Sequence, residues 1–244
     1  MQKISIIMPA YNEEKKIRKT LDKLVSYFNK NKFVYEIIIV DDGSTDKTIE
    51  IIKEFEKLLK IRILINKMNK GKGYSVKKGI LNAKYPLVLV TDADLATPIE
   101  ELAKFLKIMK QGFDIIIASR GLKESKLIVK QPFYRQIMGT TFPLLVRLLA
   151  LSEFKDTQCG FKLFKTDVAK KIVNLQTIER FCFDVEILFI AKKIGCKIKE
   201  TPVTWISKQD SKVRIIKDTL NMLADLFRIR LNDLSKKYEI NHID

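Results

Sequence analysis

The sequence predicts an α/β fold with a mostly parallel central sheet flanked by helices. Two observations carry this prediction. In the first half of the chain, short apolar runs alternate with segments whose apolar residues recur at helical spacing. The run at residues 37–40 is continuously β-branched, as in a strand that is buried on both faces. Strands that alternate with helices in this way form parallel sheets with right-handed crossovers.

The first half contains a regular succession of expected elements. The expected strands are residues 4–8, 37–40, 61–65, 86–91 and 113–119. The first helix carries apolar side chains on one face, at Ile17, Leu21, Leu24 and Phe28. Asn12 is expected to cap this helix, and Ser44 or Thr45 the next, which ends near residue 59. Two further helices are expected at residues 71–83 and 98–110.

The second half is less regular. Residues 160–164 and 198–205 are typical of strands, residues 184–194 of a helix, and residues 133–151 are long and apolar. The last segment has a helical stripe of apolar residues among many basic ones, at Ile216, Leu220, Leu223, Phe227, Leu231 and Leu234. We therefore expect a main domain over residues 1–206. An amphipathic basic helix and tail over residues 207–244 would pack on it or lie at a membrane interface.

The composition narrows the class of protein. The 244 residues include 46 Lys and Arg against 29 Asp and Glu, which gives a formal charge of +17, and 46% are hydrophobic. This apolar content excludes a charge-dominated disordered chain, and no run of about 18 apolar residues is present to span a bilayer. The 3 cysteines lack C-x-x-C spacing, which argues against a zinc site. The positive charge favours nucleic acid, an anionic membrane or phosphorylated ligands as partners.

Acidic side chains follow the fourth expected strand, where ligands bind in parallel sheets. Asp92 and Asp94 are two residues apart, so in an extended chain their side chains point to the same side. Adjacent carboxylates repel each other unless a cation lies between them, and hard oxygen ligands select Mg²⁺ or Mn²⁺. The pair is therefore a candidate metal site. The alternative is an acidic first helical turn, capped by Thr97.

Two further motifs lie at expected strand ends or helix starts. Asp41 and Asp42 follow the second strand, where a carboxylate can accept hydrogen bonds from a ribose hydroxyl or a base N–H; the alternative is a turn and helix cap. The sequence Gly71-Lys72-Gly73 opens a helix, where glycine permits close backbone approach and the helix N-terminus favours a phosphate. The spacings of the P-loop and of G-x-G-x-x-G are both absent.

Taken together, these motifs resemble the signature of glycosyltransferase family 2. The matching segments are IIMPAYNEE (6–14), VDDGSTD (40–46), NKGKG (69–73) and TDAD (91–94). In the second half, DTQCGFKLF (156–164), RFCFDVE (180–186) and PVTW (202–205) resemble the dolichyl-phosphate β-glucosyltransferases of that family. The related dolichyl-phosphate mannose synthases often carry Gln where this chain has Ala96, so the resemblance favours the glucosyltransferases.

The resemblance implies a GT-A fold and an inverting, metal-dependent transfer of glucose from UDP-glucose to a polyprenyl (dolichyl) phosphate. By motif position, the donor-binding residues would be Pro9, Tyr11, Glu13, Asp41, Asp42, Lys72 and Asp92. Asp41 or Asp42 would hold the uridine. Asp92 and Asp94 would bind Mg²⁺ or Mn²⁺ together with the diphosphate, where a divalent ion neutralises the charge of the leaving group.

The acceptor side of the site would rest on arginines. Arg120 and Arg135 match positions at which the mannose-synthase relatives bind the acceptor phosphate, and the planar guanidinium engages phosphate bidentately. A phosphate monoester is largely ionised near neutral pH because its second pKa is about 6, so a catalytic base is optional. Asp184 is the best candidate for one, unless it and Glu186 form a capping pair at a helix start. Asp156 is expected to orient a loop or the sugar.

Several alternatives stay open. The chain could be a mannose-synthase-like enzyme that uses GDP-mannose, or a soluble family 2 enzyme with a non-lipid acceptor. A nucleic-acid-binding protein has only the charge in its favour, because no nucleic-acid-binding motif is present. We expect a cytoplasmic protein without a transmembrane span, attached peripherally to the cytoplasmic face of an anionic membrane. Residues 137–151 and the final basic helix would lie in the interface, with core packing as the alternative.

Overall fold

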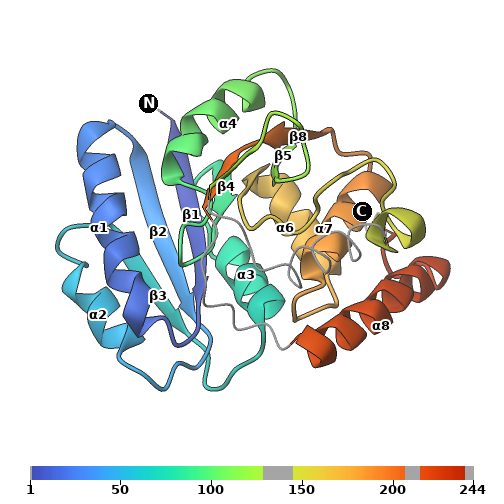
Figure 1. Cartoon of the computed structure of the whole chain (residues 1–244), viewed down its shortest axis with the longest axis horizontal. Coiled ribbons are helices and arrows are strands. Elements are labelled where there is room, and N and C mark those ends of the chain that lie inside the picture. The colour runs from blue at the N-terminus through green and yellow to red at the C-terminus, as the bar shows by residue number, and fades with distance from the viewer. Residues whose placement is uncertain (1, 129–144, 207–214, 240–244) are drawn as a thin grey trace, which may run out of the picture.

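A computed structural model of the chain describes residues 2–128, 145–206 and 215–239. A 7-stranded sheet has the order β3-β2-β1-β4-β7-β5-β8. Its strands are β1 (Lys3–Ala10), β2 (Val34–Asp41), β3 (Ile61–Ile65), β4 (Leu87–Val90), β5 (Ile115–Ser119), β7 (Lys162–Lys165) and β8 (Ile198–Pro202). Strand β7 is antiparallel to β4 and β5, and the other pairs are parallel. The predicted mostly parallel sheet is therefore confirmed (Figure 1).

Helices cover both faces of the sheet (Figure 1). They are α1 (Glu14–Lys30), α2 (Thr48–Glu54), α3 (Lys72–Leu81), the 3₁₀ turn η1 (Ile99–Glu101) with α4 (Leu102–Met109), α6 (Thr166–Leu175), α7 (Phe183–Lys193) and α8 (Ile215–Leu234). One core cluster joins the sheet to α1, α2 and α4, and a second joins it to α3, α6, α7 and α8. The layered arrangement agrees with the alternation of strand and helix in the sequence.

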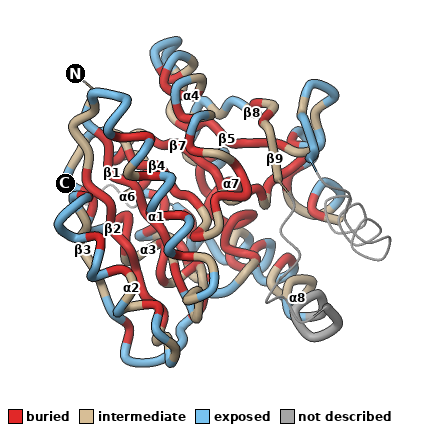
Figure 2. The backbone as a smooth tube through the Cα atoms, turned by 60° about the vertical axis from the view of Figure 1, so that its left-hand side comes forward, coloured by how far each residue is buried: buried red, intermediate tan, exposed pale blue. Residues whose placement is uncertain are grey.

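Strand β2 shows why the continuous apolar run is needed. Ile37 and Ile39 belong to the core cluster on the α1 side, whereas Ile38 and Val40 belong to the cluster on the α3 side. All four side chains are fully buried, and the central strands form the buried centre of Figure 2. A strand that is covered on both faces has no polar side, so period-two alternation is absent.

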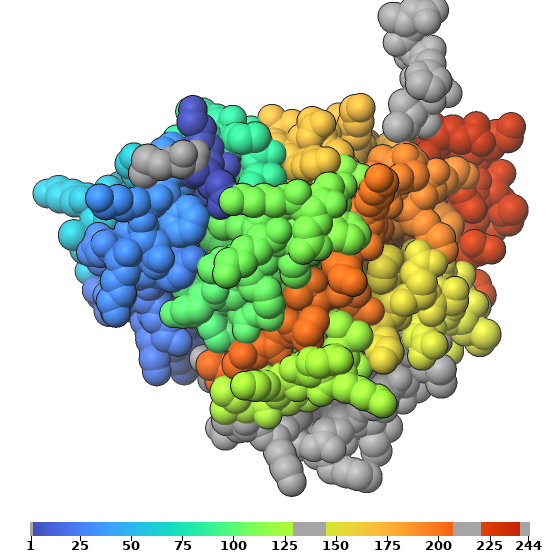
Figure 3. All heavy atoms as spheres, turned by 90° about the horizontal axis from the view of Figure 1, so that it is seen from above, coloured from blue at the N-terminus to red at the C-terminus, as the bar shows by residue number. Residues whose placement is uncertain are grey.

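The second half departs from the prediction in three ways. Helix α6 was not foreseen, and the strand β7 runs antiparallel. The expected strand at residues 198–205 divides at Val203 into β8 and β9 (Thr204–Ile206). Strand β9 leaves the main sheet and pairs in parallel with β6 (Lys126–Ile128), and Figure 3 shows the two segments in contact at the surface.

The expected helix caps were wrong. Helix α1 has no side-chain cap, and the Asn12 Oδ1 instead accepts a hydrogen bond from the Thr45 N–H at 2.8 Å. The Asn12 N–H in turn donates to Ser44 Oγ at 2.8 Å. These side chains join the loops after β1 and β2 and do not cap the helices that follow. The bonds stabilise the strand ends at which a ligand site is expected.

Helix α8 packs on the main domain through one face. Leu226 and Ile229 are fully buried in the cluster that contains α6 and α7, and Tyr238 follows them into it. The proposed interfacial segment at residues 137–151 lies mostly outside the described residues. Across the described ranges, no helix is both long enough and apolar enough to cross a bilayer.

Candidate active site

The direction of β7 decides which residues meet at the ligand edge of the sheet. The carboxyl ends of the parallel strands β1, β2, β4 and β5 lie at one edge. Because β7 runs the opposite way, its first residue Lys162 pairs with Val90 and Ile117 near the ends of β4 and β5. The segment that leads into β7 therefore reaches the same edge as Asp92 and Asp94.

Asp92 and Asp94 lie in a tight turn directly after β4. The Leu95 N–H donates to the Asp92 carbonyl at 3.1 Å, and the Ala96 N–H donates to Asp94 Oδ1 at 2.9 Å. Leu95 has φ 47°, a left-handed conformation that non-glycine residues rarely adopt. Its side chain is almost fully buried, and this packing holds the strained turn in place.

The electrostatics of this turn favour a cation. Asp92 Oδ1 lies 2.7 Å from Lys72 Nζ. Burial raises the pKa of Asp94, and the Asp92 carboxylate raises it further. Burial also acts to raise the pKa of Asp92, but the Lys72 ammonium outweighs it and the net pKa is lowered. Burial alone would lower the pKa of Lys72, whereas the carboxylates of Asp92, Asp184 and Asp94 raise it.

The two carboxylates suit a divalent ion that is shared with a ligand. Within the described ranges, no group of three or more His, Cys, Asp and Glu side chains is placed to hold a metal. Mg²⁺ and similar ions are commonly held by one or two carboxylates, with water and substrate phosphates completing the shell. Asp92 already binds a positive charge, that of Lys72. The chemistry of the donor set thus fits a metal that binds with a diphosphate.

Gly160 lies directly against the Asp92 carboxylate. A Cβ atom at position 160 would overlap Asp92 Oδ2, Cγ and Oδ1. The close approach therefore requires glycine, although nothing in the local sequence shows it. Sequence reasoning missed this contact of Gly160, because it crosses from the segment before β7 to the turn after β4.

A buried ion pair lies beside the aspartate turn. Lys162 is 1% exposed, and its Nζ donates to Asp184 Oδ1 at 2.5 Å and to the Cys159 carbonyl at 2.6 Å. Burial raises the pKa of Asp184, and the Lys162 and Lys72 ammonium groups offset part of that rise. Lys162 was also missed, although a lysine inside an apolar strand sequence is a sign of a buried charge that needs a partner.

The alternative in which Asp184 and Glu186 cap α7 is wrong. Helix α7 has no side-chain cap, and Glu186 is fully buried within the helix. Its carboxylate accepts hydrogen bonds from the backbone of Thr177 and Ile178, from the Thr177 hydroxyl and from the Tyr238 hydroxyl. Glu186 thereby ties the loop before α7 to the turn after α8. This is a structural role for Glu186, and it leaves Asp184 facing the site.

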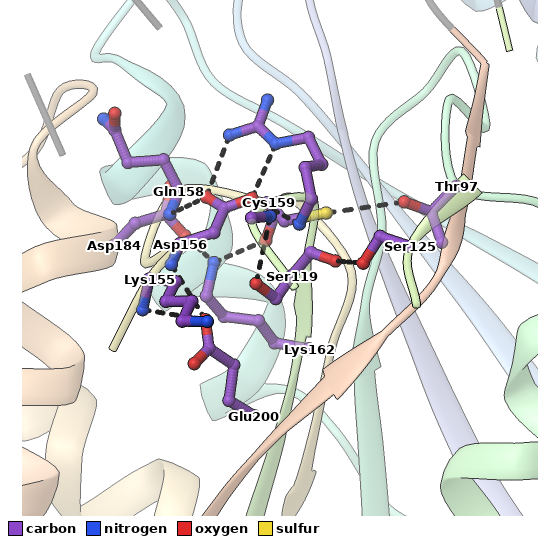
Figure 4. A network of polar contacts seen from close by, with 12 residues as sticks. Thr97, Ser119, Ser125, Lys155, Asp156, Gln158, Cys159, Lys162, Asp184 and Glu200 are labelled. Atoms are coloured by element: carbon purple, nitrogen blue, oxygen red, sulfur yellow. Dashed lines mark hydrogen bonds and ion pairs between the residues drawn. The ribbon is translucent and has the colours of Figure 1, made fainter. Parts of the chain in front are cut away.

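Arg120 and Asp156 form a bidentate pair. Arg120 Nε and Nη2 donate to the two Asp156 oxygens at 2.6 and 2.9 Å, and the Arg120 N–H donates to Oδ2 at 2.9 Å. Asp156 is held in turn by Glu200, which accepts from the Asp156 N–H (Figure 4). The Trp205 ring lies 5.5 Å from the Arg120 guanidinium carbon. The Asp156 carboxylate thus fixes the orientation of the Arg120 guanidinium through hydrogen bonds along one of its edges.

Substitution of Asp156 is expected to have a pH-dependent effect. Burial would raise its pKa, but Arg120 outweighs it and lowers the pKa from 3.8 to about 2. A lowered carboxylate pKa stabilises the fold above pH 3.8, and this stability is lost as the pH falls towards about 2. Asp156→Asn should therefore lower the free energy of unfolding by about 2 kcal/mol at pH 7. Urea denaturation between pH 7 and pH 3 should show the difference shrinking, whereas the exposed Asp22→Asn should show little difference at any pH.

The adjacent residues Asp41 and Asp42 have different surroundings. Asp42 accepts hydrogen bonds from the Lys70 and Gly71 N–H groups at 2.9 and 2.8 Å, and from Asn66 Nδ2 at 2.8 Å. Asp41 Oδ2 accepts from the Gly43 and Ser44 N–H groups. The buried Asp41 Oδ1 has no hydrogen-bond partner among the described residues. An unpaired buried acceptor is costly, so it points to a ligand donor at Asp41 rather than at Asp42.

The glycines at positions 71 and 73 have a packing role that the sequence analysis did not foresee. A Cβ at Gly71 would overlap the Glu179 carbonyl, and one at Gly73 would lie 2.6 Å from Phe183 Cβ. The Tyr74 N–H donates to the Glu179 carbonyl at 3.0 Å. The loop before α7 therefore approaches both glycines closely, while the Lys72 side chain reaches Asp92.

The remaining predicted residues lie at the end of β1 or outside the described ranges. Pro9 is in β1, and Tyr11 follows it with its side chain 37% exposed. The Glu13 N–H donates to Thr48 Oγ1 at 2.7 Å, which fixes the loop between β1 and α1. Arg135 lies outside the described residues.

Comparison with known proteins gives the family and the fold. The model of the family "Glycosyl transferase family 2" matches residues 5–173. A dolichyl-phosphate β-glucosyltransferase of Dictyostelium discoideum is 38% identical to this chain over an alignment of 244 residues. The alignment covers 95% of this chain and 75% of that protein. Mannosyl-3-phosphoglycerate synthase from Rubrobacter xylanophilus aligns with a TM-score of 0.71 at 16% identity, over 100% of this chain and 77% of its own.

A second solved structure has the same architecture. Glucosyl-3-phosphoglycerate synthase from Mycobacterium tuberculosis, determined with Mn²⁺, UDP and glucosyl-3-phosphoglycerate, aligns with a TM-score of 0.67 at 16% identity. The alignment covers 95% of this chain and 79% of that chain. At these identities the likeness concerns the fold, and it confirms the predicted GT-A architecture.

Proposed function

The chain is a glycosyltransferase that belongs to glycosyl transferase family 2, and from this premise we propose that it transfers glucose from UDP-glucose to a dolichyl (polyprenyl) phosphate. The observation that carries the proposal is the pair Asp92 and Asp94 at the end of β4, in a chain that is 38% identical to a dolichyl-phosphate β-glucosyltransferase. The arrangement around that pair supplies a place for each reactant.

The donor side uses the ends of β1, β2 and β4. Asp41 offers its unpaired Oδ1 to an N–H or hydroxyl group of the uridine, while Asp42 fixes the start of α3. Asp92 and Asp94 would hold Mg²⁺ or Mn²⁺ against the diphosphate, and such an ion neutralises the charge of the leaving group. Lys72 adds a second positive charge close to the same position.

The acceptor side uses Arg120. Its guanidinium is oriented by Asp156, with N–H groups left to engage a phosphate. A phosphate that arrives ionised attacks the anomeric carbon directly, from the side opposite the diphosphate, so that the configuration inverts. Asp184 is the proposed base for an acceptor that arrives protonated, because its raised pKa suits a proton acceptor.

A donor and acceptor panel tests this proposal. Purified protein is incubated with UDP-glucose, GDP-mannose or UDP-GlcNAc, each with a short polyprenyl phosphate or a water-soluble sugar acceptor, in the presence of Mg²⁺ or Mn²⁺. We expect a lipid-linked product only with UDP-glucose and polyprenyl phosphate. A product with GDP-mannose would assign a mannose synthase, and a product only with the soluble acceptor would reject the lipid acceptor.

We also propose that α8 attaches the enzyme peripherally to an anionic membrane. Phe227, Leu231 and Leu234 form one stripe on this helix and are 59%, 64% and 80% exposed. Exposed basic residues accompany the stripe, at Arg228, Arg230, Lys236 and Lys237. An apolar stripe beside basic residues is the pattern of an interfacial helix. A cavity of about 570 Å³ is lined by α8 and by the loop at residues 177–180, which packs on the start of α3.

Vesicle binding tests this attachment. The protein should bind vesicles of anionic lipid in flotation assays, and binding should weaken with salt because each basic residue near the surface contributes about 1 kcal/mol. Phe227→Glu with Leu231→Glu should reduce the bound fraction at least tenfold. Leu58→Glu alters a leucine that is 60% exposed elsewhere, so it should have no effect. Wild-type protein that ignores anionic vesicles at low salt would contradict the proposal.

A further inference from the structure

Lys72 places a positive charge beside the carboxylates of the aspartate turn. Its Nζ is 2.7 Å from Asp92 Oδ1, and the carboxylates of Asp94 and Asp184 also act on it. A divalent ion at the aspartate turn needs the same Asp92 carboxylate. Because two cations repel each other, the ammonium and the metal ion compete for this carboxylate.

The other cations of the site are held in place. Lys162 is 1% exposed and bonded to both Asp184 and the Cys159 carbonyl. Arg120 is bonded to both oxygens of Asp156. Lys72 differs because a single ion pair holds its ammonium group, with Asp92 as the partner, in the part of the chain that the structure describes. Lys72 is therefore the cation that is able to leave.

The backbone around Lys72 is fixed by close packing and hydrogen bonds. Gly71 and Gly73 pack against the loop before α7 so closely that neither has room for a Cβ. The Gly71 N–H is bonded to Asp42, and the Ser75 N–H to the Gly71 carbonyl. Lysine has a flexible four-carbon stem, so the ammonium group can change partner without movement of α3.

We propose that Lys72 neutralises Asp92 while the site is empty, and exchanges Asp92 for the donor diphosphate when donor and metal ion bind together. The proposal rests on the proposed function and deepens it. It makes metal binding and nucleotide binding cooperative, because the diphosphate draws away the cation that competes with the metal. Binding of one reactant alone leaves the competition in place.

Mn²⁺ titration with and without UDP, followed by the electron paramagnetic resonance signal of free Mn²⁺, tests the exchange. Wild-type protein should bind Mn²⁺ at least tenfold more tightly with saturating UDP than without it. Lys72→Met should bind Mn²⁺ alone at least tenfold more tightly than wild type, and its gain from UDP should be smaller than that of wild type by about the same factor. The diphosphate still supplies ligands to the ion in this variant, but it no longer draws away a competing ammonium group. Lys70→Met, which removes an exposed charge two residues away, should behave as wild type.

Two results would overturn the proposal. One is equal Mn²⁺ affinity of wild type and Lys72→Met in the absence of UDP. The other is that Lys72→Met binds Mn²⁺ more tightly than wild type but that UDP raises the Mn²⁺ affinity of both proteins by the same factor. Removal of a charge that does not compete for Asp92 would give this result. Lys72→Gln provides a second neutral variant, and circular dichroism checks that both fold. The titration measures binding and involves no sugar transfer. Its result can therefore be interpreted even if the glucosyltransferase assay fails.

Discussion

Asp94→Ala is expected to lower the rate of glucosyl transfer by at least roughly a thousandfold, which corresponds to about 4 kcal/mol of transition-state stabilisation. The substitution removes one of the two carboxylates proposed to hold the metal ion against the leaving diphosphate. The protein should remain folded, because the Asp94 side chain makes a local hydrogen bond with the Ala96 N–H and is not part of the buried core.

Initial rates with radiolabelled UDP-glucose and a short polyprenyl phosphate measure this effect. Asp94→Asn keeps an acceptor for the Ala96 N–H but lacks the charge. It therefore distinguishes the loss of the carboxylate charge from a change in the shape of the turn. We expect a similar loss in both variants. Asp22→Ala removes an exposed carboxylate from α1 and should retain full activity. Full activity of Asp94→Ala would reject the proposed metal site.

Gly160→Ala is expected to reduce transfer at least roughly a hundredfold, although it adds a single methyl group. The added Cβ would overlap the Asp92 carboxylate, which must then move from its position beside Lys72. A displacement of about 1 Å at a reacting centre is enough for a loss of this size. Mn²⁺ affinity should fall as well, because the displaced carboxylate is a proposed ligand.

Rates, Mn²⁺ binding and melting temperatures of the variant distinguish a local effect from unfolding. Gly112→Ala is the matched control, since Gly112 has φ 92° in the turn before β5, with no atom within 4 Å of an added Cβ. It should be destabilised by backbone strain but retain its rate. If Gly160→Ala loses no more activity than Gly112→Ala, the contact with Asp92 has no role in positioning.

Much of the fold could be predicted because its signals are local. Burial against the core explains the apolar runs of β1, β2 and β4 and the apolar stripe of α1. Both patterns are visible in the spacing of apolar residues along the chain. The predicted cap at Asn12 was wrong because the Asn12 side chain bonds to Thr45 in another loop, a contact that the local sequence does not reveal. The same holds for β9, which is separated from β8 by its pairing with β6.

The candidate site divides in the same way. Asp41, Asp92 and Arg120 lie at or just after the ends of strands, so their place at one edge of the sheet could be predicted from the sequence. Lys162 begins β7 and Gly160 lies two residues before it, and the antiparallel course of this four-residue strand has no signature in the sequence. The choice between Asp41 and Asp42 also required the structure, because both residues have the same charge and follow the same strand.

By itself, the sequence determined the layered α/β architecture, the acidic turn after β4 and the family of this protein, since each depends on residue type and spacing along the chain. Only the tertiary structure decided that Lys72 neutralises Asp92, that Gly160 leaves room for the Asp92 carboxylate and that Lys162 holds Asp184. These contacts join residues from different elements. The energy of a buried charge depends on which partner lies within hydrogen-bonding distance, and that partner is set by the packing of the sheet rather than by the neighbouring sequence.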